Sequence, residues 1–174
     1  MKTRNFLFTS LLALASTVAV NAQTFDIDML KVQPVYSAEN GQGYDIVAAP
    51  KAKSNAPFFY SVKVADGNYK VTVVLGSKKK AGKTVVRAEN RRLMLDEVST
   101  RKGEFKTFSF VVNKRSPYIT DKMNVKIKPR EKETFTWDEK LTLEFTGAAP
   151  VVKSIKVEPA PAETTTVFLC GNST

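Results

Sequence analysis

Apolar and polar residues alternate in short stretches along most of the chain after residue 23. Residues 69–75 (YKVTVVL) carry an apolar side chain at every second position, which is typical of a strand that buries one face. Related patterns predict further strands over residues 25–30, 57–64, 83–89, 107–112, 125–127, 141–145 and 155–157. The chain is therefore expected to be rich in β-strands.

Turn-forming sequences separate these stretches. Residues 65–68, 80–83 and 101–104 each contain the glycine that tight turns favour. A helical period is sustained nowhere, and residues 88–98 are the one segment where we expect a helical turn. Many short strands at regular spacing predict an all-β fold, an antiparallel β-sandwich of jelly-roll type.

The pattern changes near the C-terminal end. The sandwich is predicted to occupy residues 23–157, and residues 158–164 form a Pro/Ala linker of the kind that separates domains. Residues 165–174 then begin with a β-branched and apolar run that is typical of the first strand of a buried parallel sheet. Because no partner strand follows it, we interpret the sequence as the N-terminal piece of a longer protein.

The N-terminus is typical of an exported protein. Lys2 and Arg4 precede an apolar run over residues 6–20, and small residues lead to a cleavage position after Ala22. The alternative is a membrane-anchoring helix, but the run is shorter than the roughly 20 residues that a spanning helix needs. We therefore expect residues 1–22 to be a signal peptide and the mature protein to be secreted or periplasmic, with no membrane association.

Composition excludes several kinds of catalytic site. The chain has no histidine and one cysteine. It therefore has no Ser-His-Asp triad, no Cys-His pair and no His-ligated metal, and it can form no internal disulfide. The sequence as it stands is not expected to be a complete hydrolase.

The last four residues, Gly171-Asn172-Ser173-Thr174, contain a candidate nucleophile. A serine on a turn after a buried strand can attack an ester while backbone N–H groups stabilise the oxyanion. Two other readings stay open: the serine and threonine can cap a helix, and Asn172-Ser173-Thr174 also matches a glycosylation acceptor.

The run TTVFLCGNST resembles the opening block of SGNH (GDSL-type) hydrolases. The preceding chain resembles the galactose-binding-like β-sandwich of secreted bacterial rhamnogalacturonan acetylesterases, through residues 25–26, 60–64, 67–73, 88–95, 103–107 and 137–143. The resemblance implies that Ser173 is the nucleophile, that its own N–H contributes to the oxyanion hole, and that no metal or organic cofactor takes part. The implied reaction is the hydrolysis of acetyl esters on a pectic polysaccharide.

The sequence departs from this family in two respects. Asn172 stands where the family usually has Asp, and the family's oxyanion Gly and Asn and its Asp-x-x-His block do not occur. A serine hydroxyl needs a base to accept its proton, and no imidazole is present. We therefore expect the fragment alone to be inactive, and a non-catalytic carbohydrate-binding or structural module is the alternative.

The whole chain carries a net charge of +10, and its basic residues are concentrated in the middle. Candidate contacts to a polyanion are Lys78, Lys79, Lys80 and Lys83 on one predicted hairpin, together with Arg91 and Arg92. The alternative is a solvated surface. An acidic, pectin-type polysaccharide suits the charge better than nucleic acid, because the basic runs lack interleaved aromatic residues.

Aromatic side chains are the other candidates for sugar contacts. Tyr44 and Tyr118 lie in polar surroundings, whereas Trp137 shares strand parity with Leu141 and is expected to be buried. The acidic pair Asp138-Glu139 is interpreted as a turn rather than a calcium loop. The sequence does not determine the oligomeric state.

Overall fold

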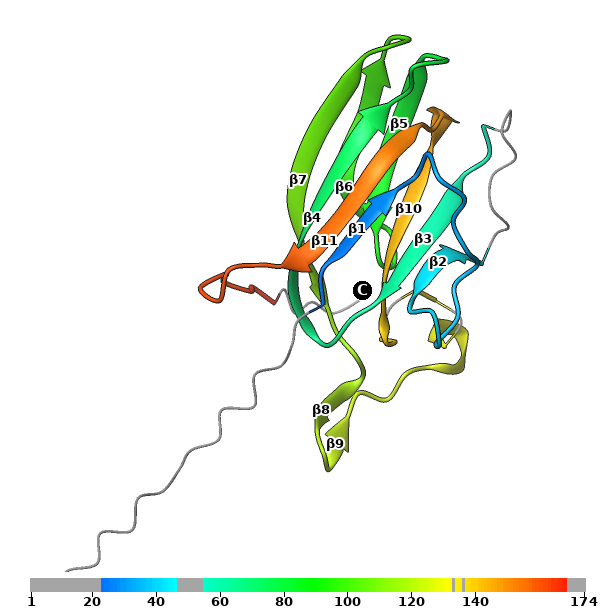
Figure 1. The fold of residues 1–174 in the computed structure, drawn as a ribbon. Coiled ribbons are helices and arrows are strands. Elements are labelled where there is room, and N and C mark those ends of the chain that lie inside the picture. The colour runs from blue at the N-terminus through cyan, green and yellow to red at the C-terminus, as the bar shows by residue number, and fades with distance from the viewer. Residues whose placement is uncertain (1–22, 47–54, 133, 136, 169–174) are drawn as a thin grey trace, which may run out of the picture.

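Two antiparallel β-sheets pack face to face in the computed structural model, which describes residues 23–46, 55–132, 134–135 and 137–168 (Figure 1). The four-stranded sheet has the order β1 (Phe25–Asp28), β11 (Val152–Pro159), β4 (Gly67–Gly76), β7 (Phe105–Lys114). The five-stranded sheet has the order β2 (Gln42–Asp45), β3 (Phe58–Lys63), β10 (Lys140–Ala149), β5 (Gly82–Ala88), β6 (Arg92–Thr100). The predicted antiparallel β-sandwich is confirmed.

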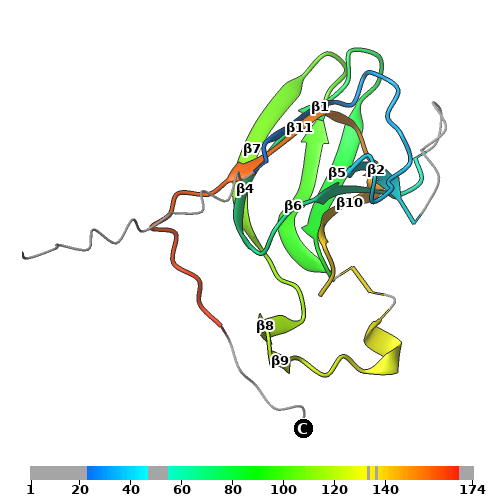
Figure 2. The same cartoon turned by 60° about the horizontal axis from the view of Figure 1, so that its bottom comes forward.

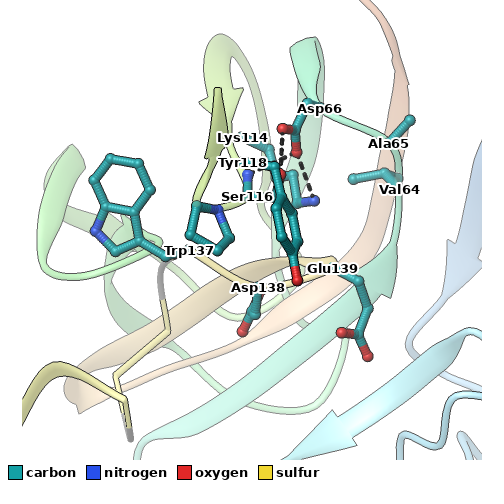
Figure 3. Close-up of a pocket in the computed structure, with 10 residues that line it drawn as sticks. Val64, Ala65, Asp66, Lys114, Ser116, Tyr118, Trp137, Asp138 and Glu139 are labelled. Atoms are coloured by element: carbon teal, nitrogen blue, oxygen red, sulfur yellow. Dashed lines mark hydrogen bonds and ion pairs between the residues drawn. The ribbon is translucent and has the colours of Figure 1, made fainter. Parts of the chain in front are cut away.

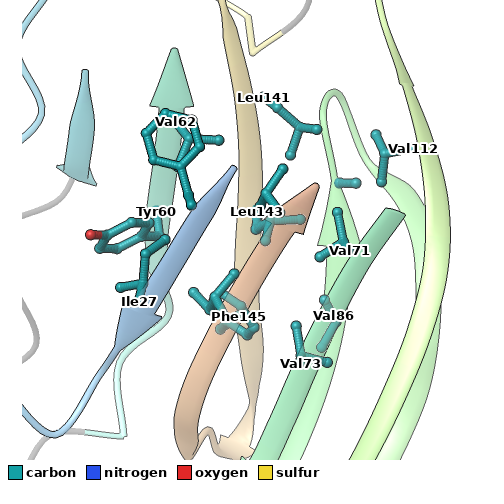
Figure 4. Packing of buried hydrophobic residues seen from close by; sticks show 14 of the residues in the cluster. Ile27, Tyr60, Val62, Val71, Val73, Val86, Val112, Leu141, Leu143 and Phe145 are labelled. Carbon is teal, nitrogen blue, oxygen red and sulfur yellow. The ribbon is translucent and has the colours of Figure 1, made fainter. Parts of the chain in front are cut away.

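The core lies between the two sheets and follows the predicted alternation. Val71, Val73 and Leu75 of β4 are fully buried. Val71 and Val73 lie across the sandwich from Leu143 and Phe145 of β10 (Figure 4). Each fully buried aliphatic or aromatic side chain of this kind stabilises the fold by roughly 1.5–3 kcal/mol. The strands whose inward positions are all apolar are therefore the ones that the sequence predicts best.

Residues 88–98 are not helical, and this prediction was wrong. They belong largely to β6, which pairs with β5 from Gly82↔Thr100 to Ala88↔Arg92 at the edge of the five-stranded sheet. The strand is mostly exposed, and the pairing shifts register at two points. Exposure and these bulges hide the two-residue period that identifies a strand.

Two other segments differ from expectation. Residues 125–127 form no strand, and the alternation there marks partly buried side chains in an irregular segment. The strand nearby is β9 (Met123–Asn124), which pairs with β8 (Tyr118–Thr120) and precedes the short 3-10 helix η1 (Pro129–Glu131). β2 was not predicted, because it shows no apolar alternation and its Gly43 lies against the backbone of residues 34–36.

The three glycine-containing turns join strands of different sheets, so they are not hairpins. The turn at 65–68 leads from β3 to β4, the turn at 80–83 lies where the β4–β5 connection enters β5, and the turn at 101–104 leads from β6 to β7. The connections β4–β5, β6–β7 and β10–β11 consequently lie at one end of the sandwich. The connections β3–β4, β5–β6 and β7–β8 lie at the opposite end, together with the segment before β10 (Figure 1).

Beyond β11 the chain leaves the four-stranded sheet at the end where β4 begins and continues past that end of the sandwich (Figure 2). The Asn68 side chain donates hydrogen bonds to the Thr164 carbonyl oxygen at 3.2 Å and to the Thr166 hydroxyl at 2.9 Å, and the Arg115 guanidinium lies 4.6 Å from the Phe168 ring centroid. Residues 165–168 of the predicted strand are not in a strand; residues 169–174, including Ser173, lie outside the described residues, as does the predicted signal peptide. No helix among the described residues is long and apolar enough to cross a membrane.

Candidate functional site

A pocket of about 530 Å³ opens at the end of the sandwich where β3 and β7 finish (Figure 3). Three segments form it: the β3–β4 turn, the connection from β7 to β8, and the residues just before β10. Its lining consists of Val64, Ala65, Asp66, Lys114, Ser116, Pro117, Tyr118, Trp137, Asp138 and Glu139. We refer to these ten residues as the pocket.

Asp66 connects two of these segments. One carboxylate oxygen accepts hydrogen bonds from the Lys114 ammonium at 3.0 Å and from the Ser116 amide at 2.7 Å, and the other accepts one from the Ser116 hydroxyl at 2.6 Å. Burial alone would raise the pKa of Asp66, but the hydrogen bonds from Ser116 and Lys114 hold it below its ordinary value. The Lys114 side chain is only 3% exposed, so this ion pair is a fixed part of the pocket wall.

Two aromatic side chains, Tyr118 and Trp137, line the pocket (Figure 3). Tyr118 is 70% exposed. Trp137 is partly buried and has a φ of 65°. This left-handed conformation is uncommon for a bulky residue, and it removes Trp137 from the alternation of β10, which begins at Lys140. The expectation that Trp137 belongs to the core was therefore wrong.

The other predicted sugar-contacting aromatic has a different role. Tyr44 is only 9% exposed, and its ring meets Phe58 and Tyr60 edge-to-face at centroid distances of 5.8 and 5.5 Å. It belongs to the hydrophobic core, so its face is not available to a ligand. Tyr118 is thus the one of the two candidates that remains accessible.

The acidic pair beside Trp137 stabilises a turn. Asp138 accepts a hydrogen bond from the Lys140 amide at 2.8 Å, and burial raises its pKa. The carbonyl oxygen of Glu139 accepts one from the Val64 amide at 3.1 Å. The described residues contain no group of three or more His, Cys, Asp or Glu side chains that could hold a metal ion.

A buried carboxyl group supports the neighbouring β5–β6 turn. Glu89 is 3% exposed, accepts a hydrogen bond from the Thr142 amide at 3.0 Å, and lies 3.9 Å from the Arg92 guanidinium. Burial raises its pKa to about 7. Glu89 and Arg91 also line a second, smaller hollow of about 350 Å³. Sequence reasoning missed Glu89, because no local pattern marks a glutamate as buried.

The predicted polyanion-binding residues are divided between the two ends. Lys78, Lys79, Lys80 and Lys83 gather on the β4–β5 connection and the start of β5, at the end opposite the pocket. Arg91 and Arg92 lie a full strand away on the β5–β6 turn, where Arg92 donates a hydrogen bond to the Asn113 carbonyl oxygen at 2.7 Å. The structure therefore brings the four lysines together and separates both arginines from them.

Comparisons with known proteins concern the fold. Neither a scan of protein-family models nor a search of curated protein sequences gave a match. A crystal structure of the Bacillus subtilis protein YxiM aligns with a TM-score of 0.48 and 18% identity, over 83% of this chain and 42% of that one. A family 35 carbohydrate-binding module from Clostridium thermocellum aligns with a TM-score of 0.33 and 12% identity, over 75% of this chain and all of that one. The chain thus spans less than half of the first neighbour, and both similarities are those of β-structure alone.

Proposed function

We propose that the sandwich is a non-catalytic carbohydrate-binding module and that its pocket holds sugar rings. Sugar rings pack their C–H faces on aromatic side chains, while their hydroxyl groups need nearby donors and acceptors. The pocket offers Trp137 and Tyr118 for the first role, and the Asp138 and Glu139 carboxylates and the Ser116 hydroxyl for the second. This combination is typical of an open ligand site.

The position of Trp137 is the observation that carries the proposal. A bulky residue held at φ 65° costs on the order of 1 kcal/mol or more, and such strain is concentrated at functional sites. The conformation places the indole at the pocket wall instead of the core (Figure 3). We infer that the indole is retained there to contact a ligand.

The pocket chemistry favours binding over catalysis. Ser116 donates its hydroxyl hydrogen to Asp66, but a carboxylate with a lowered pKa is a weak base and a poor activator of a serine. Asp138 is engaged with the Lys140 amide. These contacts hold the pocket in shape and leave it without an activated nucleophile.

The ligand that we propose is an acidic, pectin-type polysaccharide. The net charge of +10 supports a negatively charged partner, because long-range attraction raises the local concentration of such a chain. That attraction should weaken as salt screens it, whereas stacking on Trp137 should persist.

Alanine variants of the two pocket aromatics test the proposal against pectin fragments in calorimetric titrations. Trp137→Ala should weaken binding at least tenfold and Tyr118→Ala by a few-fold, since each removes a stacking surface. Phe168→Ala is the matched control, because this ring is exposed at 61% and lies outside the pocket. Unchanged affinity of Trp137→Ala, or no binding by the wild type at low or high salt, would contradict the proposal.

A second proposal concerns the longer protein. We propose that this chain is the N-terminal part of a secreted SGNH-type carbohydrate esterase, supported by the order of β-sandwich, Pro/Ala linker and Gly-Asn-Ser-Thr. Ser173 would be the nucleophile, with His and Asp supplied beyond residue 174. A coding frame that continues into an Asp-x-x-His block is the expected finding, and a stop codon after Thr174 would overturn it. Export would be shown by an N-terminus at Gln23 in the mature protein.

A further inference from the structure

Eight basic residues gather at the end of the sandwich opposite the pocket, and we call this surface the lysine-rich end. They come from the β4–β5 and β6–β7 connections and from the adjoining ends of β5, β7 and β11 (Figure 1). The set consists of Lys78, Lys79, Lys80, Lys83, Arg101, Lys102, Lys106 and Lys153. Lys106 belongs to this set because β7 pairs with β4 and places Lys106 opposite Leu75, near the end of β4.

The acidic groups at this end do not neutralise the basic ones. Glu97 pairs with Lys83 at 3.1 Å, and Glu104 pairs with Lys106 at 3.5 Å. Lys78, Lys79 and Lys102 are exposed and form no ion pair within the described part of the chain. These three ammonium groups are therefore available to an anion from outside.

The backbone that carries these charges is held in place. The Gly103 amide donates a hydrogen bond to the Ser77 carbonyl oxygen at 2.9 Å and so links the β6–β7 and β4–β5 connections. The Gly76 amide donates one to the carbonyl oxygen of Val151, in the β10–β11 connection, at 3.2 Å. A side chain on Gly76 would collide with the Glu104 carbonyl oxygen, so the two turns touch directly. The backbone positions from which these side chains extend therefore need no reordering when a partner binds.

A shallow hollow of about 430 Å³ lies within this surface. It is lined by Ala81, Ser99, Thr100, Arg101, Glu104 and Lys106. Arg101 is exposed at its rim, and a guanidinium matches the geometry of a carboxylate with two parallel hydrogen bonds. The hollow thus offers the Arg101 guanidinium and the exposed Ser99 side chain beside the Glu104–Lys106 ion pair, and the guanidinium suits a sugar ring that carries a carboxylate.

We propose that the lysine-rich end is a second binding surface, separate from the pocket, for the carboxylates of a uronate polysaccharide. This inference rests on the proposed acidic ligand. Nucleic acid fits the surface less well, because single strands stack their bases on exposed aromatic rings. The most exposed aromatic residues among those described are Tyr118 and Phe168, and both lie at the other end.

Two charge-matched variants of the full chain test the proposal. Lys78→Ser/Lys79→Ser/Lys102→Ser removes three cations from the lysine-rich end. Lys122→Ser/Lys126→Ser/Lys128→Ser removes three exposed cations from the segment around β9 at the other end, so the net charge changes equally. Binding to sodium polygalacturonate would be measured by calorimetric titration at low salt and at about 0.5 M NaCl, where the screening length is only a few ångströms.

The first variant should bind about tenfold more weakly at low salt, and the control no more than about twofold more weakly, because each exposed ion pair adds a small increment. The difference should disappear at high salt. Wild-type affinity of the first variant, or an equal loss in both, would overturn the proposal. Tighter binding of a single-stranded oligonucleotide than of polygalacturonate would also overturn it.

The Trp137→Ala variant separates this inference from the proposed pocket. If the pocket proposal alone is wrong, Trp137→Ala binds polygalacturonate as the wild type does while the lysine variant is still weakened. If the lysine-rich surface alone is wrong, the lysine variant is unaffected and Trp137→Ala loses the binding that persists at high salt. The two failures therefore give different patterns.

Discussion

The pocket and the lysine-rich end lie at opposite ends of the same β-sandwich. They differ in whether their charged side chains are buried and paired or exposed. At the pocket end of the sandwich, Lys114 in the pocket and Glu89 on the neighbouring β5–β6 turn are almost completely buried, and each has a partner in a distant segment. A buried charge is costly unless it is paired and hydrogen-bonded, so these contacts fix the positions of the surrounding turns.

The lysine-rich end has the reverse arrangement. Its charges at Lys78, Lys79 and Lys102 are exposed, and its connections are held by backbone contacts at Gly76 and Gly103. Exposed cations attract a polyanion over a distance without requiring a precise geometry. The comparison indicates that one end is suited to defined rings and the other to diffuse charge.

The largest expected effect concerns the buried carboxyl of Glu89. Its pKa of about 7 in the folded protein exceeds its ordinary value, so the folded state binds more protons between about pH 4.5 and 7. The free energy of unfolding should therefore fall as pH rises through this window, by up to about 3 kcal/mol. Arg92, Lys114 and Asp138 are the charged groups around it.

Glu89→Gln is the matched variant for this prediction, since its side-chain oxygen can still accept from Thr142. Urea unfolding at pH 5 and pH 8 should show a smaller loss of stability for the variant than for the wild type. An unchanged pH dependence would contradict the raised pKa of Glu89 and the role of its buried carboxyl at the pocket end.

Glycine substitutions test the backbone at the lysine-rich end. Gly76→Ala should destabilise the fold by about 2–3 kcal/mol, because φ is 129° and the new methyl group would meet the Glu104 carbonyl oxygen. Gly103→Ala should cost only about 1 kcal/mol, since φ is 83° but nothing lies within 4 Å of the added carbon. Thermal unfolding would compare them, and equal effects would argue against close contact between the turns.

Removing the Asp66 carboxylate tests how much the buried ion pair of the pocket contributes to the stability of the fold. Asp66→Ala leaves the Lys114 ammonium buried without its partner and should cost about 2 kcal/mol, less than for a wholly buried pair because Asp66 is about one-third exposed. The pKa of Asp66 is lowered, so its contribution is present near neutral pH and lost as pH falls through that lowered value. Asp121→Ala, at an exposed position, is the control and should change little in denaturant unfolding.

The smallest effect is expected from the lysines themselves. Lys78→Ser/Lys79→Ser/Lys102→Ser should change the free energy of unfolding by less than about 0.5 kcal/mol, because exposed positions away from specific contacts contribute little. Equilibrium unfolding beside the wild type measures it. A loss similar to that of Asp66→Ala would mean that these lysines are structural after all.

The strands that could be predicted are those with a buried face. β4 and β10 carry apolar residues at their inward positions, so the alternation marks them directly. β6 was misread because its outward and inward residues are both largely exposed. Trp137 was misplaced because its left-handed backbone interrupts the parity on which the burial argument depended.

The pocket could be predicted only in part. Tyr118 was predicted as an accessible aromatic residue in polar surroundings, and Asp138 as part of an acidic turn. Both line the pocket. Lys114 could not be found, since its partner Asp66 lies 48 residues earlier in the chain. Ion pairs across such separations depend on which strand ends meet, and no local pattern records that.

By itself, the sequence determined the two-sheet β-architecture, the core positions and the overall positive charge, because side-chain alternation and composition are local properties of the chain. The tertiary structure decided which turns share an end. Arg91 follows Lys83 closely in sequence, yet the seven residues of β5 carry the chain about 20 Å between them. Each long strand carries the chain from one end of the sandwich to the other, and several consecutive strands cross between the two sheets, so residues from distant turns assemble the pocket.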